Sequence, residues 1–316
     1  MGTETSKQPD LSVDLCGITL RNPTVLASGI LGLSRGLLQR VADCGAGAAT
    51  IKSVTLEPRE GHNNPTVIAY EAGMLNAVGY SNPGIEATLD EFSDLDEVPI
   101  PVFASAVGQN AEEFAEAAEK LSTCDFAAIE LPLSCPHTPG YGTMAGHGTP
   151  AATEQIARAV RQVTDKPVFI KISPNVSGVG EVALAALEGG ADGITAVNSL
   201  GPGMIINLET RTPVLGFRAG GVTGPALRPV AVRCIYDVRA AMRREGWDAP
   251  IIGVGGVSTG RHALEMIMAG ANAVGVGTAV YQRGPEVFAK IRNELQRECN
   301  KLHISCLADA HATAQE

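Results

Sequence analysis

The chain has 316 residues, of which 45% are hydrophobic and 18% are charged, a composition typical of a soluble globular protein. It carries 34 acidic and 24 basic residues, and the net charge of −10 argues against nucleic acid or an anionic membrane as a partner. No stretch has the apolar length of a signal peptide or a membrane helix, so we expect a cytoplasmic protein. The seven cysteines are scattered and form no Cys-x-x-Cys pair, so we expect reduced thiols and no bound metal.

Eight short runs of small and β-branched apolar residues recur along the chain and predict strands. Each run is almost continuously apolar, as parallel strands covered on both faces are. In chain order the runs are residues 24–29, 46–53, 101–107, 126–133, 167–174, 192–199, 249–256 and 273–280.

Helical patterns lie between most of these runs, with apolar residues three and four positions apart. They cover residues 111–121, 151–163, 180–187 and 261–269. The eight runs span 257 residues, or about 32 for each unit, which is close to the length of one βαβ repeat. The pattern therefore favours an α/β fold of the (β/α)8 TIM-barrel type over a doubly wound open sheet, which uses the same alternation.

The remaining segments predict additions to a single domain whose barrel spans about residues 24–280. Residues 11–23 read as a two-stranded N-terminal flap that closes the bottom of the barrel, and residues 286–302 read as a closing helix. Two long insertions, residues 56–88 and 202–229, follow the ends of strands. In a barrel this is the catalytic face, so we expect the insertions to hold substrate; the alternative is a pair of surface loops without a role.

The seventh and eighth runs end in paired glycines. Gly255 and Gly256 close the seventh run, Gly277 and Thr278 close the eighth, and we expect helices to begin at Ser258 and at Tyr281. Glycine lets backbone N–H groups approach an anion, and the loops after strands 7 and 8 commonly hold phosphate in barrels. We therefore predict a phosphate cradle, with tight turns as the alternative.

Two lysines stand at the ends of apolar runs, Lys52 and Lys171. A buried ammonium without a partner is strongly disfavoured, so each lysine requires an anionic or polar group nearby. One interpretation is a lysine that forms a Schiff base, and the other is a clamp on an anionic or carbonyl-rich ligand.

Cys135 ends the fourth run and opens a glycine-rich loop, which suggests a base or a nucleophile on a lid. Asparagines 76, 82 and 198 also fall on the predicted catalytic face, where their amides would suit a planar ligand with C=O and N–H groups. Loop asparagines more often form turns, and for Asn82, which precedes Pro83, a turn former without a ligand contact is the alternative. We expect the other buried thiols to be inert; these are Cys16, Cys44, Cys124 and Cys234.

Together these residues resemble the class 1 dihydroorotate dehydrogenases, most closely the class 1B catalytic subunits and their archaeal relatives. The resemblance extends from Leu11 to about Phe288. It rests on segments 26–32, 51–53, 57–62, 75–84, 134–136, 170–175, 198–199, 220–225, 253–256 and 275–278.

The resemblance implies FMN bound across the barrel mouth and dihydroorotate stacked on the flavin. It implies that Cys135 takes the C5 proton of dihydroorotate while C6 passes a hydride to flavin N5, a step of pyrimidine biosynthesis. The implied FMN contacts are Ser28, Lys52, Ser53, Lys171, Gly221, Gly255, Gly256, Gly277 and Thr278. The implied substrate contacts are Lys52, Asn76, Asn198 and Ser199.

Three residues depart from the family pattern. Pro132 and His137 stand where the family usually has asparagines, and Tyr80 stands where it usually has leucine. Proline offers neither a side-chain amide nor an N–H, so position 132 cannot make the hydrogen bond to the ligand that an asparagine would make. A related dihydropyrimidine dehydrogenase with another substrate and a catalytically silent scaffold subunit are therefore alternatives, and a phosphosugar aldolase or isomerase would leave the asparagines unexplained.

The resemblance also implies partners. The chain has no clustered cysteines for an iron–sulfur centre, so electrons would pass to an FAD and iron–sulfur subunit that reduces NAD. A homodimer or a heterotetramer is the expected assembly.

Overall fold

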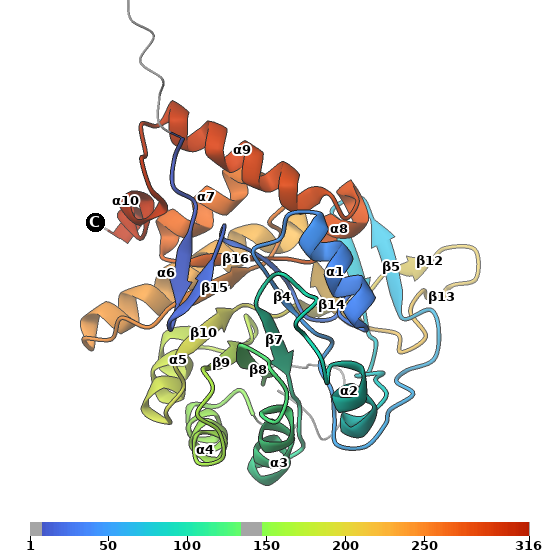
Figure 1. Cartoon of the computed structure of the whole chain (residues 1–316). Coiled ribbons are helices and arrows are strands. Elements are labelled where there is room, and N and C mark those ends of the chain that lie inside the picture. The colour runs from blue at the N-terminus through green and yellow to red at the C-terminus, as the bar shows by residue number, and fades with distance from the viewer. Residues whose placement is uncertain (1–7, 134–146, 316) are drawn as a thin grey trace, which may run out of the picture.

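Eight parallel strands close into a barrel in the computed structural model, which describes residues 8–133 and 147–315 (Figure 1). In chain order they are β3 (Thr24–Leu26), β4 (Ala48–Thr50), β7 (Val102–Ser105), β8 (Ala128–Pro132), β9 (Val168–Ile172), β10 (Gly193–Ala196), β15 (Ile251–Val254) and β16 (Ala273–Val276). Each strand falls inside one of the eight predicted runs, and β16 pairs with β3 to close the ring. The predicted TIM barrel is confirmed, and the open-sheet alternative is wrong.

Helices surround the barrel and follow its strands in turn (Figure 1). They are α1 (Arg35–Asp43), α2 (Ile85–Glu91), α3 (Ala111–Leu121), α4 (Pro150–Arg161), α5 (Val179–Glu188), α6 (Arg228–Arg244), α7 (Gly260–Ala269), α8 (Thr278–Arg283) and α9 (Val287–Lys301), followed by α10 (Leu307–Ala310). The part of the chain that the structure describes also contains the short 3-10 turns η2 (Pro225–Leu227) and η3 (Thr313–Gln315).

The helix boundaries follow from capping residues. The predicted bounds of α3 are correct at both ends. The helix begins at Ala111 because the Asn110 side chain caps its first turn and accepts a hydrogen bond from the Glu113 N–H at 2.9 Å. The predicted start of α8 at Tyr281 is wrong. This helix begins three residues earlier, at Thr278, directly after the glycine that follows β16.

An N-terminal hairpin closes the bottom of the barrel. Its strands are β1 (Val13–Leu15) and β2 (Ile18–Leu20), and Leu15 and Leu20 are fully buried against the barrel interior. The interior residues that they meet are apolar, namely Val25, Ala48, Phe103, Ala128, Phe169, Ile252 and Ala273. This hydrophobic layer seals the end of the barrel opposite the catalytic face.

The interior becomes polar one layer higher. Side chains on one face of a strand recur at every second residue, so the residues two positions after the apolar layer also point inward. Five of these interior positions carry buried polar side chains, which are Thr50, Ser105, Glu130, Lys171 and Thr195. Of these five, Lys171 also lines the cavity at the mouth, whereas Thr50, Ser105, Glu130 and Thr195 lie beneath it.

The two insertions pair with each other to form a second sheet over the barrel mouth. The strands lie in the order β11 (Leu200–Gly203), β14 (Gly220–Thr223), β6 (Gly73–Asn76) and β5 (Val67–Tyr70), all antiparallel. A small apolar cluster of Leu75, Ala77 and Leu215 packs against this sheet. A further hairpin, β12 (Ile206–Asn207) and β13 (Thr212–Pro213), extends from this region.

Within residues 8–133 and 147–315, no helix is long and apolar enough to cross a membrane.

Candidate active site at the barrel mouth

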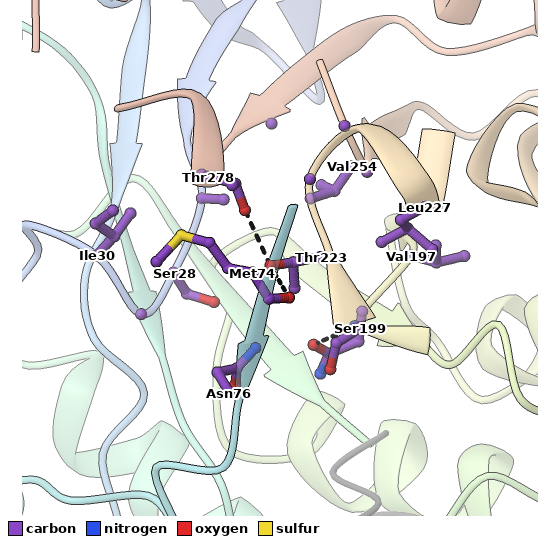
Figure 2. A pocket seen from close by; sticks show the side chains of 18 of the residues that line it. Ser28, Ile30, Met74, Asn76, Val197, Ser199, Thr223, Leu227, Val254 and Thr278 are labelled. Atoms are coloured by element: carbon purple, nitrogen blue, oxygen red, sulfur yellow. Dashed lines mark hydrogen bonds between the residues drawn. The ribbon is translucent and has the colours of Figure 1, made fainter. Parts of the chain in front are cut away.

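A cavity of about 360 Å³ lies between the C-terminal ends of the barrel strands and the second sheet. Its volume falls within the range of small-molecule binding sites. Figure 2 shows that apolar side chains form much of its wall, with a few polar groups among them. Ile30, Met74, Val197, Leu227 and Val254 are apolar, whereas Ser28, Asn76, Ser199, Thr223 and Thr278 offer polar groups. Such a wall fits a flat, largely apolar ligand with polar edges.

Most of the residues predicted from the sequence to contact the cofactor or the substrate line this one cavity. They are Ser28, Lys52, Ser53, Asn76, Lys171, Asn198, Ser199, Gly255, Gly256, Gly277 and Thr278. Gly221 does not line the cavity, but its carbonyl oxygen accepts a hydrogen bond at 3.2 Å from the Asn76 side chain, which does. Cys135 and His137 lie outside the described residues.

The glycines at the ends of β15 and β16 leave room for a ligand. Gly256 has a φ of +72°, and a Cβ there would lie 2.7 Å from the Gly224 carbonyl oxygen, so only glycine fits this turn. A Cβ at Gly277 would have Ala27 Cβ as its nearest neighbour, at 3.7 Å, so the backbone at this point faces open space. The turns therefore bring backbone close to the cavity, as a phosphate cradle requires.

A pair of threonines connects the cradle to the second sheet. Thr278 donates a hydrogen bond to the Thr223 hydroxyl at 3.0 Å, and Thr223 donates to the Met74 carbonyl oxygen at 3.2 Å (Figure 2). Thr223 itself lines the cavity, although it is not among the residues that the sequence selects. The signal for it in the sequence is its place in segment 220–225, one of the segments that carry the family resemblance.

Lys171 has the buried partner that its position in the sequence requires. Its Nζ lies 3.3 Å from Oε1 of Glu130, and both side chains are about 5% exposed or less. Ser28 joins the pair, because its hydroxyl donates to Glu130 at 3.0 Å and accepts from Lys171 at 3.1 Å. A lysine paired with a carboxylate is an ammonium and not the neutral amine that forms a Schiff base, so this geometry favours the clamp. The sequence does not identify Glu130 as this partner, because Glu130 and Lys171 lie on different strands and meet only when β8 pairs with β9.

Lys52 also lines the cavity. It follows β4, and its Nζ lies 5.7 Å from the ring centroid of Tyr80, within the range of a cation–π contact. Tyr80 is itself part of the wall, and so is Pro132, the last residue of β8. Two of the residues that depart from the family pattern therefore face the ligand space.

The three asparagines have different roles in the structure. Asn76 and Asn198 line the cavity, and Asn198 Oδ1 accepts a hydrogen bond from the Ser199 N–H at 2.8 Å. Asn82 does not line the cavity; its side chain is buried and bonds to the backbone of Thr55, Tyr80 and Gly84. Asn82 is therefore a turn former, and the expectation that it faces a ligand is wrong.

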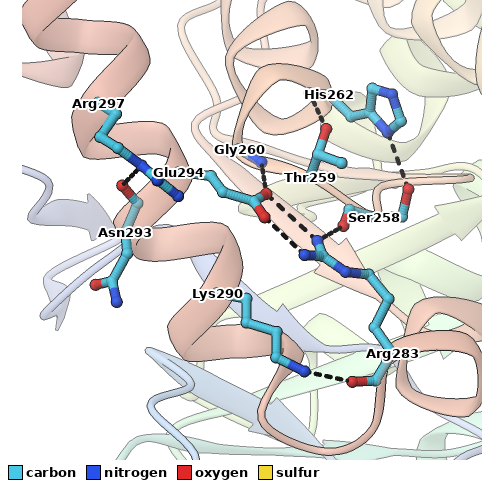
Figure 3. Close-up of polar contacts among 9 residues, drawn as sticks. All are labelled: Ser258, Thr259, Gly260, His262, Arg283, Lys290, Asn293, Glu294 and Arg297. Atoms are coloured by element: carbon cyan, nitrogen blue, oxygen red, sulfur yellow. Dashed lines mark hydrogen bonds and ion pairs between the residues drawn. The ribbon is translucent and has the colours of Figure 1, made fainter.

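A polar network supports the cradle from behind (Figure 3). Glu294 of α9 binds the Arg283 guanidinium at 2.6 Å and accepts from the Gly260 N–H at 2.8 Å, while Arg283 also donates to the Ser258 carbonyl oxygen. Burial alone would raise the pKa of Glu294, but these hydrogen bonds outweigh burial and lower the pKa below its usual value. The network fixes α8 and α9 to the loop after β15, whose Ser258 lines the cavity.

The cysteines within the described ranges are free thiols. Cys124 and Cys234 are buried as expected, but Cys16 is exposed and Cys44 is half-buried, so the expectation that these two are buried is wrong. Burial raises the pKa of Cys234 to about 11, and partial desolvation of the Cys16 thiol together with the charge of Asp192 raises its pKa to a similar value. A thiol with so high a pKa stays protonated at neutral pH, in line with the expectation that these cysteines are inert.

The position of the cavity defines the class of the protein, since TIM-barrel enzymes carry their active sites at the C-terminal ends of the barrel strands. The family model described as dihydroorotate dehydrogenase matches residues 10–299. The chain therefore belongs to the dihydroorotate dehydrogenase family.

Archaeal relatives support the same assignment over nearly the whole chain. A protein of Methanothermobacter thermautotrophicus named dihydroorotate dehydrogenase B (NAD(+)), catalytic subunit, is 43% identical over 308 residues, 97% of this chain and 96% of that protein. A protein of the same name from Pyrococcus horikoshii is 43% identical over 299 residues, which are 95% of this chain and 96% of that protein. Another from Methanosarcina mazei is 45% identical over 279 residues, which are 88% of this chain and 87% of that protein. The resemblance to class 1B subunits and archaeal relatives is confirmed, and the chain is an oxidoreductase of pyrimidine biosynthesis, not an aldolase or isomerase.

Proposed function

We propose that this chain uses FMN to oxidise dihydroorotate to orotate. The observation that carries the proposal is that eleven residues selected from distant parts of the sequence line a single cavity at the barrel mouth. When bound, FMN supplies the acceptor for the hydride that leaves C6 of dihydroorotate, at flavin N5. The chain's own residues supply the binding, the orientation and the proton transfer.

The glycine-lined end of the cavity suits the phosphate of FMN. Gly255, Gly256 and Gly277 bring backbone N–H groups near the ligand space, and Thr278 adds a hydroxyl. The contacts to the flavin ring are assigned to Ser28, Lys52, Ser53, Lys171 and Gly221. The ammonium groups among them suit the carbonyl oxygens of the ring, and the apolar wall suits its faces.

The amide side chains suit the pyrimidine. Asn76, Asn198 and Ser199 offer both donors and acceptors, which match the alternating C=O and N–H groups of dihydroorotate. Lys52 suits its carboxylate or the adjoining flavin. These groups come from the second sheet, from the end of β10 and from the end of β4, so the position of the sheet over the barrel brings them to one ligand.

Cys135 is proposed as the base that removes the C5 proton of dihydroorotate. Replacement of Cys135 by serine removes a thiol that can lose its proton near neutral pH and leaves a hydroxyl that cannot. We expect the Cys135→Ser variant to retain FMN and to be reduced by dihydroorotate roughly 10²–10⁴ times more slowly, the usual contribution of a general base. Anaerobic stopped-flow absorbance measures this rate, and equal rates in both proteins would remove Cys135 as the base.

The proposed partner is an FAD and iron–sulfur subunit that transfers electrons to NAD. The names of the relatives support it, because each is called a catalytic subunit of an NAD-linked enzyme. A homodimer of this chain, or a heterotetramer that includes the partner subunit, is the assembly we propose.

A second candidate is the oxidation of another dihydropyrimidine. The observation that favours it is that Pro132 and Tyr80 both line the cavity, in place of the asparagine and the leucine usual in the family. Without an amide at position 132, the site would select less strongly for dihydroorotate. The two candidates differ in which dihydropyrimidine reduces the bound flavin, so comparing dihydroorotate with other dihydropyrimidines separates them.

A further inference from the structure

Glu130 is a buried acid that the proposed function does not use. It occupies an interior position of β8, its side chain is 4% exposed, and it does not line the cavity. Its partner Lys171 stands on the neighbouring strand β9 and does line the cavity. One member of the ion pair therefore faces the ligand space, and the other lies beneath it.

The geometry makes the two charges a single unit. Glu130 Oε1 receives both the Lys171 ammonium, at 3.3 Å, and the Ser28 hydroxyl, at 3.0 Å. Removing one partner of a buried pair leaves an uncompensated charge, whereas the intact pair has a net charge of zero. Lys171 can therefore donate a hydrogen bond to a ligand without placing a net positive charge beside it.

We propose that Glu130 is a positioning residue, which holds the Lys171 ammonium in the cavity wall, cancels its charge and thereby sets the reduction potential of the bound flavin. This inference rests on the proposed function, because it requires FMN in the cavity. FMN bound in this cavity would accept a hydride from dihydroorotate and would thereby gain one negative charge. An uncancelled ammonium nearby would stabilise that charge, and the carboxylate of Glu130 limits this effect.

The test is the midpoint potential of FMN-loaded protein, measured by spectrophotometric titration against reference dyes. Glu130→Gln removes the charge and keeps the size of the side chain. We expect the equilibrium to shift at least tenfold toward reduced flavin, which is about +30 mV for a two-electron couple. The double variant Glu130→Gln/Lys171→Met has no charge at either position, just as the intact ion pair has no net charge, so we expect its potential to lie close to that of the native protein.

Thr195→Val is the matched control. Thr195 stands on β10 and pairs in register with Lys171 of the adjacent strand β9. It also points into the barrel and is fully buried, but it carries no charge. We expect this variant to keep the potential of the native protein.

Each outcome separates the inference from the proposed function. Native protein that fails to retain FMN on gel filtration overturns both. A loaded Glu130→Gln variant with an unchanged potential, or a double variant Glu130→Gln/Lys171→Met that keeps the full positive shift relative to the native protein, overturns only the role of Glu130. If Glu130→Gln does not fold, Glu130→Asp withdraws the carboxylate by one methylene, and we expect a smaller positive shift; a native potential in that variant overturns the inference.

Discussion

At the scale of single residues, Pro132 is the sharpest departure from the pattern that the family resemblance implies. Its ring lines the cavity at the end of β8, where an amide would otherwise offer a donor and an acceptor. A strand end tolerates proline, because the missing N–H interrupts little of the ladder. The change therefore alters the ligand surface and leaves the barrel intact.

Replacing Pro132 by asparagine should tighten the binding of orotate. One added hydrogen bond contributes about 0.5–1.5 kcal/mol, so we expect the Kd to fall roughly 2–10-fold. Pro132→Ala is the control, since it removes the ring without adding an amide. Titration of the flavin absorbance with orotate gives both constants, and an asparagine variant that binds no more tightly than the alanine variant would show that the amide finds no partner.

Single residues also show which contacts can be predicted from the sequence alone. The chemistry of Lys171 is sufficient to predict that a partner exists, because a buried ammonium needs one. The identity of the partner requires the register of β8 against β9, which local sequence does not encode. Whether Asn82 contacts a ligand or forms a turn depends on the surrounding backbone. In the structure its Oδ1 accepts hydrogen bonds from the backbone N–H groups of Thr55 and Gly84, so it forms a turn.

At the scale of elements, the network of Arg283, Glu294 and Gly260 should make the attachment of α9 sensitive to acid. The folded-state pKa of Glu294 lies below its ordinary value of 4.5, so its stabilisation is present above that value and is lost as the pH falls through the folded pKa. We expect Glu294→Gln to lower the free energy of unfolding by roughly 1–2 kcal/mol at pH 7, and by progressively less below pH 4.5.

Urea unfolding at pH 7 and below pH 4.5 measures this difference. Glu298→Gln is the control on the same helix, because the partner of Glu298 is Arg261, whose side chain is 76% exposed. We expect that variant to change stability by less than about 0.5 kcal/mol. A Glu294→Gln protein whose loss of stability is the same at both pH values would contradict the role of the network.

The contact between α7 and α9 depends on a glycine. A Cβ at Gly260 would lie 2.0 Å from the Leu295 nitrogen, which belongs to the backbone of α9 and cannot turn aside. We expect Gly260→Ala to destabilise the protein by roughly 1–3 kcal/mol or more. A Cβ at Gly36 in α1 would have no atom within 4 Å, so Gly36→Ala should be neutral or stabilising. Thermal denaturation compares the two, and equal melting temperatures would refute the contact.

At the scale of the whole molecule, the barrel is predictable because its signal is repeated. Each of the eight strands is buried on both faces and therefore reads as an apolar run, and the spacing of the runs matches the βα repeat. The second sheet is not predictable in this way. Its central pair joins β6 to β14, Asn76 opposite Gly221, across 145 positions of sequence, and no local pattern specifies such a pairing.

The cavity is predictable to the extent that the barrel builds it. Barrel topology brings the C-terminal ends of all eight strands to one face, so residues recognised separately at those ends converge. Met74 and Thr223 belong to the second sheet, and their place in the wall follows only from the long-range pairing of its strands.

The most direct test of FMN-dependent oxidation of dihydroorotate is anaerobic mixing of the FMN-loaded protein with dihydroorotate while the flavin absorbance is followed. We predict rapid bleaching by dihydroorotate and much slower bleaching by dihydrouracil at the same concentration, because the site offers Lys52 and amide groups to the additional carboxylate. A yellow protein that dihydroorotate leaves unbleached would contradict the proposal, and bleaching by dihydrouracil alone would favour another dihydropyrimidine as the substrate.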